Sequence, residues 1–199
     1  MNESVPAEFV EALTSLKGAR ARPEIHLAEI PPPTRIAPWA LALTAEVNPS
    51  SDPEEMLGHG RFVALHDPSG QAAWHGTFRI IVMAAATIDS EMGMDPLLAE
   101  AGWSWLLDSL EDSGAGYHHV SGTVTRTMSE SFGGLELTES DIEMEIRASW
   151  TPNTTDLAPH LDGWLTLLAS LTGLPPISPE VTALTRKVSA GKSSIRHRV

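Results

Sequence analysis

The sequence has no cysteine, almost no lysine, and no long hydrophobic run. Because none of the 199 residues is cysteine, disulfides, thiolate zinc sites and cysteine nucleophiles are excluded. The longest apolar run, 80–86, is far shorter than the ~20 residues that a membrane span needs. The N-terminus has no basic patch followed by an apolar stretch, which is the pattern of a signal peptide. We therefore expect a soluble, cytoplasmic protein that does not contact membranes.

Negative charge is concentrated in the middle of the chain. Residues 23–179 hold five arginines, no lysine and 22 acidic side chains, a net charge of 5 − 22 = −17. A field of this sign repels phosphates, so we expect no nucleic-acid binding by this part. Residues 180–199 hold five basic side chains and one acidic one. They are predicted to be a flexible solvated tail, and contact with nucleic acid or an acidic partner is the alternative.

Hydrophobic periodicity predicts helices and strands in a simple order. Residues 1–22 contain a short amphipathic helix that ends at Gly18, and residues 23–179 form one domain. The segment 20–38, with its three consecutive prolines, is predicted to be an extended connector. Strands are predicted at 39–47, 61–66, 74–88, within 114–135, and at 141–150. Two further helices are predicted at 95–113 and 155–172.

These elements predict an α+β fold. We expect a mainly antiparallel sheet of about five strands with helices on one face, in the order α-β-β-β-α-β-β-α. This order is similar to that of the type III secretion chaperone fold, whose members are small, acidic and usually dimeric. The stretches GWSWLLDSL at 102–110 and GWLTLLASL at 163–171 agree at six of nine positions. The same 61-residue offset superposes 61–66 on 122–127 and 78–88 on 139–149, so a duplicated ββα unit and chance agreement are both open explanations.

The strand within 114–135 alternates hydroxyl side chains with mostly apolar ones. A solvent-facing sheet surface is the favoured interpretation of the hydroxyl row, and a ligand groove is the alternative. Arg126 lies on the apolar side, where an unpaired guanidinium would be unfavourable. It is therefore predicted to pair with an acidic residue or to extend its head group past the sheet edge, and binding of an anionic group is the alternative. The candidate binding residues of this strand are His119, Arg126, Ser129, Glu130 and Ser131.

No catalytic or cofactor signature accompanies this strand. A G-x-S-x-G turn is missing around Ser129 and Ser131, and the eight histidines show no metal-ligand spacing, so we expect no catalytic residue, metal or cofactor. Trp103 and Trp105 are two residues apart on a predicted helix and cannot both face the same core. One of them is predicted to be exposed or to lie at an interface, where tryptophan is enriched.

Four stretches of the sequence resemble an uncharacterised actinobacterial family, domain of unknown function three thousand. They are GRFVALHDPSGQAAWHGTFR, DPLLAEAGWSWLLDSL, GAGYHHVSGTVTRTMSESFGG and EIRASWTP, and the resemblance covers about 25–176. It implies a small cytoplasmic protein without assigned activity. From the residues themselves we predict a non-enzymatic adaptor or chaperone-like protein that forms a homodimer and binds a protein partner. The alternative is a binder of a small anionic ligand, or an enzyme, that uses a groove near Arg126 and the Ser/Thr-rich strand.

Overall fold

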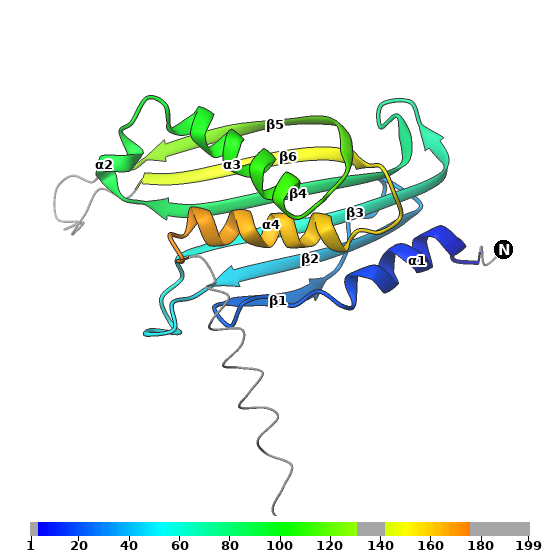
Figure 1. Cartoon of the computed structure of the whole chain (residues 1–199), viewed down its shortest axis with the longest axis horizontal. Coiled ribbons are helices and arrows are strands. Elements are labelled where there is room, and N and C mark those ends of the chain that lie inside the picture. Colours follow the sequence, from blue (N-terminus) through cyan, green and yellow to red (C-terminus); the bar gives the residue numbers. More distant parts are fainter. Residues whose placement is uncertain (1–3, 131–141, 176–199) are drawn as a thin grey trace, which may run out of the picture.

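A six-stranded antiparallel sheet is the centre of the computed structural model, which describes residues 4–130 and 142–175 (Figure 1). The order of the strands in the sheet is β1-β2-β3-β4-β6-β5. Their bounds are β1 Ile25–Ile30, β2 Trp39–Val47, β3 Gly58–Gln71, β4 Gly76–Ile88, β5 Tyr117–Met128 and β6 Ile142–Pro152. The helices are α1 Ala7–Leu16, α2 Ser90–Gly93, α3 Leu98–Asp112 and α4 Ala158–Leu171. None of the described helices is long and apolar enough to cross a membrane.

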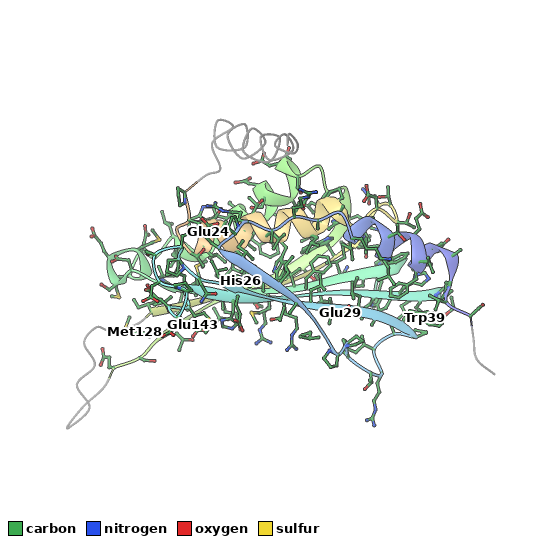
Figure 2. All side chains as sticks on the ribbon, turned by 90° about the horizontal axis from the view of Figure 1, so that it is seen from below. Glu24, His26, Glu29, Trp39, Met128 and Glu143 are labelled. Atoms are coloured by element: carbon green, nitrogen blue, oxygen red, sulfur yellow. The ribbon has the colours of Figure 1, made fainter. Side chains whose placement is uncertain are left out.

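The core lies between the sheet and the helices α1, α3 and α4. Alternate residues of the central strands point toward these helices, because successive strand side chains point to opposite faces. They form one buried apolar cluster with the inner sides of the helices, and its largest fully buried members include Phe62, Ile80, Ile146, Trp150 and Trp164. All the helices lie on the same side of the sheet in Figure 2. Among residues 4–130 and 142–175, no helix lies over the other face.

The sheet has six strands rather than the predicted five, because residues 25–30 form β1. The prediction of an extended connector over 20–38 was wrong for these residues. Ile25 lies opposite Val47 and Ile30 opposite Ala42, so β1 adds a full antiparallel ladder to β2. A short segment beside prolines has only weak hydrophobic periodicity, so its sequence does not predict a strand. Its backbone N–H and C=O groups are nevertheless satisfied by pairing with β2 at the edge of the sheet.

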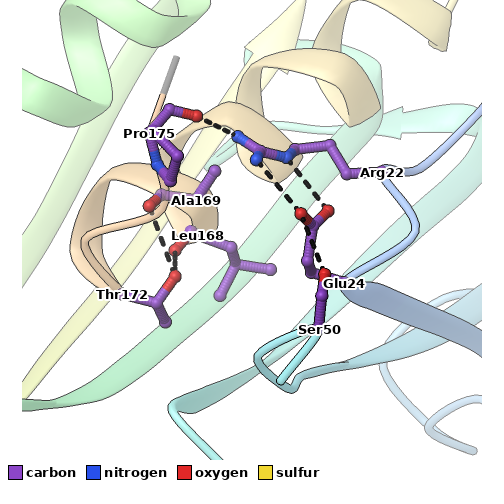
Figure 3. A network of polar contacts seen from close by, with 7 residues as sticks. All are labelled: Arg22, Glu24, Ser50, Leu168, Ala169, Thr172 and Pro175. Carbon is purple, nitrogen blue, oxygen red and sulfur yellow. Dashed lines mark hydrogen bonds and ion pairs between the residues drawn. The ribbon is translucent and has the colours of Figure 1, made fainter. Parts of the chain in front are cut away.

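The connection from α1 to β1 is tied to the end of α4 by a small polar network (Figure 3). The Arg22 guanidinium donates to the Pro175 carbonyl oxygen at 2.6 Å and lies 3.4 Å from a Glu24 carboxylate oxygen. Ser50 lies 3.5 Å from the other oxygen of Glu24. Hydrogen bonds to this carboxylate, from the backbone first and then from Arg22, lower the pKa of Glu24. The N-terminal helix is therefore fixed to the body at both of its ends, since Phe9 near its start is also buried.

Two ββα units, β3-β4-α3 and β5-β6-α4, lie on either side of an approximate two-fold axis between β4 and β6. The central strands are antiparallel, and the outer strands β3 and β5 flank them symmetrically. A matching contact joins the units crosswise. A Cβ placed on Gly60 of β3 would lie 2.7 Å from the ring of Trp164 in α4, and one placed on Gly122 of β5 would lie 2.8 Å from the ring of Trp103 in α3.

The two crosswise contacts favour duplication over chance agreement, but they correct the offset of the strands. The residue numbers of each β4–β6 pair add to 230, as in Ile80 with Trp150 and Ile88 with Ile142. Residues of such a pair face the same side of the sheet, and a two-fold axis through the sheet keeps every side chain on its own face. Equivalent residues of the two strands must therefore differ by an even number. The glycines are 62 residues apart and the tryptophans 61. A 61-residue offset of the strands would superpose inward-facing Val82 on outward-facing Glu143, and was therefore wrong for them.

Candidate functional site

The face of the sheet without helices, which we call the open face, has an apolar centre and polar sides. It carries Val63 of β3 with Ile81 and Met83 of β4, and then the hydroxyl row of β5. One end of the face is covered by Trp74, which is 8% exposed and packs with buried Ala42, Val63 and Leu65. The remainder has no covering element among the described residues (Figure 2). The predicted solvent-facing hydroxyl row is therefore one border of a larger surface.

A depression of about 420 Å³ lies on the open face across the two ββα units. Its floor is apolar, and its rim carries hydroxyl and guanidinium groups. The polar side chains of the lining are Arg61, Ser121, Thr123, Arg147 and Ser149, and no acidic residue belongs to it. Volumes of a few hundred Å³ are typical of small-ligand sites. This depression is the candidate site of the described structure.

The two arginines of the rim differ in how they are held. Arg147 forms a two-pronged ion pair with Glu145, with nitrogen–oxygen distances of 2.6 and 3.1 Å. This pair lowers the pKa of Glu145 and raises the pKa of Arg147. Arg61 is exposed and has no ion pair or side-chain hydrogen bond within the part of the chain that the structure describes. Arg61 is therefore the cation of the rim that is available to an incoming anion.

Next to the depression, Arg79 of β4 fixes the beginning of β5. Its side chain is buried, and it donates to the His119 carbonyl oxygen at 2.9 Å, to Thr151 Oγ1 at 3.2 Å and to Ser149 Oγ at 2.6 Å. Burial lowers the pKa of Arg79. The register of β5 against β6 shifts between His118 and Ser121, so Arg79 holds the bulged backbone where regular pairing is interrupted.

Three histidines gather at this bulge. The rings of His75 and His119 stack with centroids 3.8 Å apart, and His118 meets His119 edge-on at 5.1 Å. His75 and His119 have φ values of +55° and +52°, which are uncommon for residues other than glycine. Partial desolvation lowers the pKa of His119, and the nearby His75, His118 and Arg79 lower it further. These stacked rings join the β3–β4 turn to β5.

Arg126 and the hydroxyl row do not form one groove. Arg126 extends toward the helix-covered side, where it donates to the carbonyl oxygens of Gly93 at 3.2 Å and Asp95 at 2.7 Å. The hydroxyl row lies opposite Arg147 and Ser149 of β6, on the open face. The predicted pairing of Arg126 with an acidic side chain is replaced by bonds to main-chain oxygens, because the connection between α2 and α3 passes directly beside β5.

The other predicted site residues are spread over the molecule. Ser129 and Glu130 are exposed just after β5, and Ser131 lies outside the described residues. His119 belongs to the bulge beside the depression. Trp103 and Trp105 are both half-buried against the main core, and Trp103 covers Gly122 of β5. The structure thus brings none of the six described candidate residues into the lining of the depression itself.

The sequence contained a signal for the residues that line the depression. In the central strand 76–88, apolar side chains occur on both parities, and such a strand is expected to be covered on both faces. The structure covers only one face with helices, which leaves Ile81 and Met83 half-buried on the other. Arg61 and Arg147 are at outward positions of predicted strands, but their approach across the intervening strand β4 is a property of the sheet order.

The chemistry that this site supports is binding. Ser149 Oγ accepts a hydrogen bond from Arg79, and Ser121 has no histidine or carboxylate within hydrogen-bond distance in the described part of the chain. Within residues 4–130 and 142–175, no group of three histidine, aspartate or glutamate side chains is placed to hold a metal ion. An apolar floor with a free guanidinium and hydroxyl donors suits a ligand that has both apolar and anionic parts.

Comparison with known proteins gives one match. Residues 5–182 match the family described as "Protein of unknown function (DUF3000)". This span extends beyond both ends of 25–176 and includes α1. Neither the curated proteins nor the solved structures contain a match to this chain. The similarity of the element order to type III secretion chaperones therefore stays a prediction.

Proposed function

The chain belongs to the DUF3000 family, whose description assigns no activity, and from the geometry alone we propose that it is a non-enzymatic adaptor that binds a partner protein on the open face. The observation that carries this proposal is the apolar floor at Ile81 and Met83, which no element of the described residues covers. Apolar surface with a polar rim is a feature of protein interaction sites.

Charge indicates the chemistry of the partner segment. Residues 23–179 have a net charge of −17, but the lining of the depression contains two arginines and no carboxylate. An acidic partner would be repelled by most of the surface and accepted here. We therefore propose an extended partner segment that places apolar side chains on the floor and a carboxylate beside Arg61.

Differential capture from native cells tests this proposal. Arg61→Glu and Met83→Asp are expected to lose the same captured proteins, because each change places a carboxylate in the depression. Arg20→Glu is the matched control, since Arg20 is an exposed arginine beside α4 on the helix-covered side. The proposal fails when quantitative mass spectrometry shows the same proteins with wild type, Arg61→Glu and Met83→Asp.

The size of the depression favours a second function, binding of a small anionic ligand. About 420 Å³ lies in the range that small-molecule sites occupy. A thermal-shift screen with aliphatic and aromatic carboxylates is expected to raise the Tm of the wild type and of Arg20→Gln, but not of Arg61→Gln. Equal shifts in all three proteins, or no shift with any ligand, would exclude this function for the depression.

A further inference from the structure

The two edges of the sheet are protected to different degrees. β1 is six residues long, carries Glu29 and is followed directly by three prolines. β5 is twelve residues long, and past the bulge, from Ser121 to Met128, it has no proline, lysine, aspartate or glutamate. Natural sheets usually block an exposed edge with such residues, because its free N–H and C=O groups pair readily with another strand.

The approximate two-fold axis shows which position beside β5 is vacant. β3 has β4 on one side and β2 on the other, and nine residue pairs join it to β2. β5 is the counterpart of β3 and has β6 on its inner side. In the described residues no strand lies on its outer side. The unit β5-β6-α4 thus lacks the neighbour that its counterpart has.

The edge of β5 is suited to a second copy of the same chain. Two copies with a net charge of −13 each repel one another, and association is easiest where a surface has no carboxylate. Residues 121–128 provide such a stretch, about 27 Å long in extended form. Their one charged side chain, Arg126, extends toward the main chain of the α2–α3 connection.

We propose that β5 pairs antiparallel with β5 of a second copy, with the two-fold axis at Thr125. The two sheets then continue into one, and the hydrogen-bonding groups of both edges are satisfied. In this register Thr125 faces its own equivalent, Thr123 faces Thr127, and Arg126 faces Val124, so no like charges are opposed. Threonine pairs across antiparallel strands are favourable, each by about 0.2–1 kcal/mol.

The pairing leaves the depression accessible and does not rest on the adaptor function. It uses the backbone edge of β5, whereas Ser121 and Thr123 still project onto the open face. It also places Trp103 close to the interface. Trp103 covers Gly122 and is only half-buried in the single chain. A second copy beside β5 brings new surface next to the exposed part of this ring, as the prediction for one of the two tryptophans requires.

Charge exchange at Thr125 tests the interface. Thr125→Glu and Thr125→Lys each oppose like charges across the axis, so each variant alone is expected to be monomeric by size-exclusion chromatography with light scattering. An equimolar mixture is expected to form dimers, because Glu then faces Lys. Thr87→Glu is the matched control, since Thr87 is exposed on the open face in the central strand β4, and its protein is expected to remain dimeric.

Cross-linking gives a second, independent measurement. Because the chain has no cysteine, Thr125→Cys introduces a single thiol that is expected to form a covalent dimer with a short bis-maleimide. Thr87→Cys is expected to stay uncross-linked. A wild type that is monomeric at about 100 µM, a dimer that survives Thr125→Glu, or a mixture that stays monomeric would each overturn the proposal.

Discussion

The Trp164–Gly60 and Trp103–Gly122 contacts join the same two residue types, but one lies on an inner strand of the sheet and the other on an edge strand. In each, an indole from one ββα unit lies on a glycine in the outer strand of the other unit. Trp164 is completely buried, packs 5.7 Å from Phe62 and donates its N–H to the Met83 carbonyl oxygen at 3.1 Å. Trp103 is half-buried, and its strand is the edge of the sheet.

The difference shows that a strand's neighbours, rather than its own sequence, decide how firmly such a contact is fixed. β3 lies between β2 and β4, so the glycine beneath Trp164 cannot move away from the ring. β5 is held on one side only. The same pair of residue types therefore stabilises the core in one unit and remains available for association in the other.

The largest expected effect is on Trp164. Trp164→Ala is expected to lower the free energy of unfolding by about 3–5 kcal/mol, because it leaves a large cavity in a fully packed site. Trp103→Ala is expected to lower it by about 1–2 kcal/mol, since part of its side chain is already in water. Urea denaturation of both variants checks this order, and equal losses would show that the two settings are energetically alike.

The next largest expected effect is that of acid, which acts through the buried His160 of α4. Trp150 of β6 is completely buried and donates its indole N–H to Nδ1 of His160 at 3.0 Å. Burial lowers the pKa of His160 from 6.5 to about 4. The folded chain therefore binds fewer protons than the unfolded chain between these values.

The free energy of unfolding is therefore expected to fall as the pH is lowered from about 6.5 to about 4. For one fully neutral buried imidazole this loss is about 3 kcal/mol. This stability is present in full above pH 6.5. Denaturation curves of the wild type and His160→Gln, measured from pH 7 to pH 4, check it. The wild type should lose more than the variant does, and parallel losses would contradict the role of His160.

The glycines beneath the two rings give the next largest effect. Gly60→Ala is expected to cost about 2–3 kcal/mol, because the new methyl group meets the ring of Trp164 and the Met83 carbonyl oxygen, both fixed. Gly122→Ala meets the ring of Trp103 and the main chain of β6, but β5 is free to shift outward. A cost of about 1 kcal/mol is therefore expected, and thermal unfolding in the Thr125→Glu background measures it without the contribution of association.

The smallest effect is a difference in hydrogen exchange. In Thr125→Glu the outward-facing amides of β5 are expected to exchange faster than those of β3, since only β3 has neighbours on both sides. In the wild type the two strands should become similar as pairing protects the edge. Rapid exchange of β5 at high wild-type concentration would speak against pairing.

The sequence predicted the parts of the fold that have their own periodicity. The α+β class and the antiparallel sheet with helices on one face are confirmed, and the alternating strand predicted at 141–150 is β6, Ile142–Pro152. β1 was missed because its apolar alternation is short and lies beside prolines. The helix predicted from Asp95 begins at Leu98, because the Asp95 carboxylate accepts the Leu97 N–H at 2.8 Å within a turn that precedes the helix.

The candidate site was less accessible to prediction, because it depends on which strands are neighbours. Arg61 and Arg147 are far apart in the sequence and meet across β4 only through the order β3-β4-β6. Arg126 was correctly placed on the apolar side of its strand, but its partners are main-chain oxygens, which have no residue signature. A sequence pattern indicates the type of a side chain and the face of the strand on which it lies. It does not indicate hydrogen bonds to main-chain carbonyl oxygens.

The buried guanidinium of Arg79 has a consequence for the faces that the side chains of β5 occupy. Because it binds the His119 carbonyl oxygen from β4, it sets the point at which β5 starts to run in step with β6. Tyr117 and His118 before this point pair with Pro152 and Thr151, and the residues from Ser121 onward pair with β6 in a shifted register. A slip of one residue in this register would exchange the faces of every later side chain in β5. The contact from Arg79 therefore helps to keep the hydroxyl row on the open face.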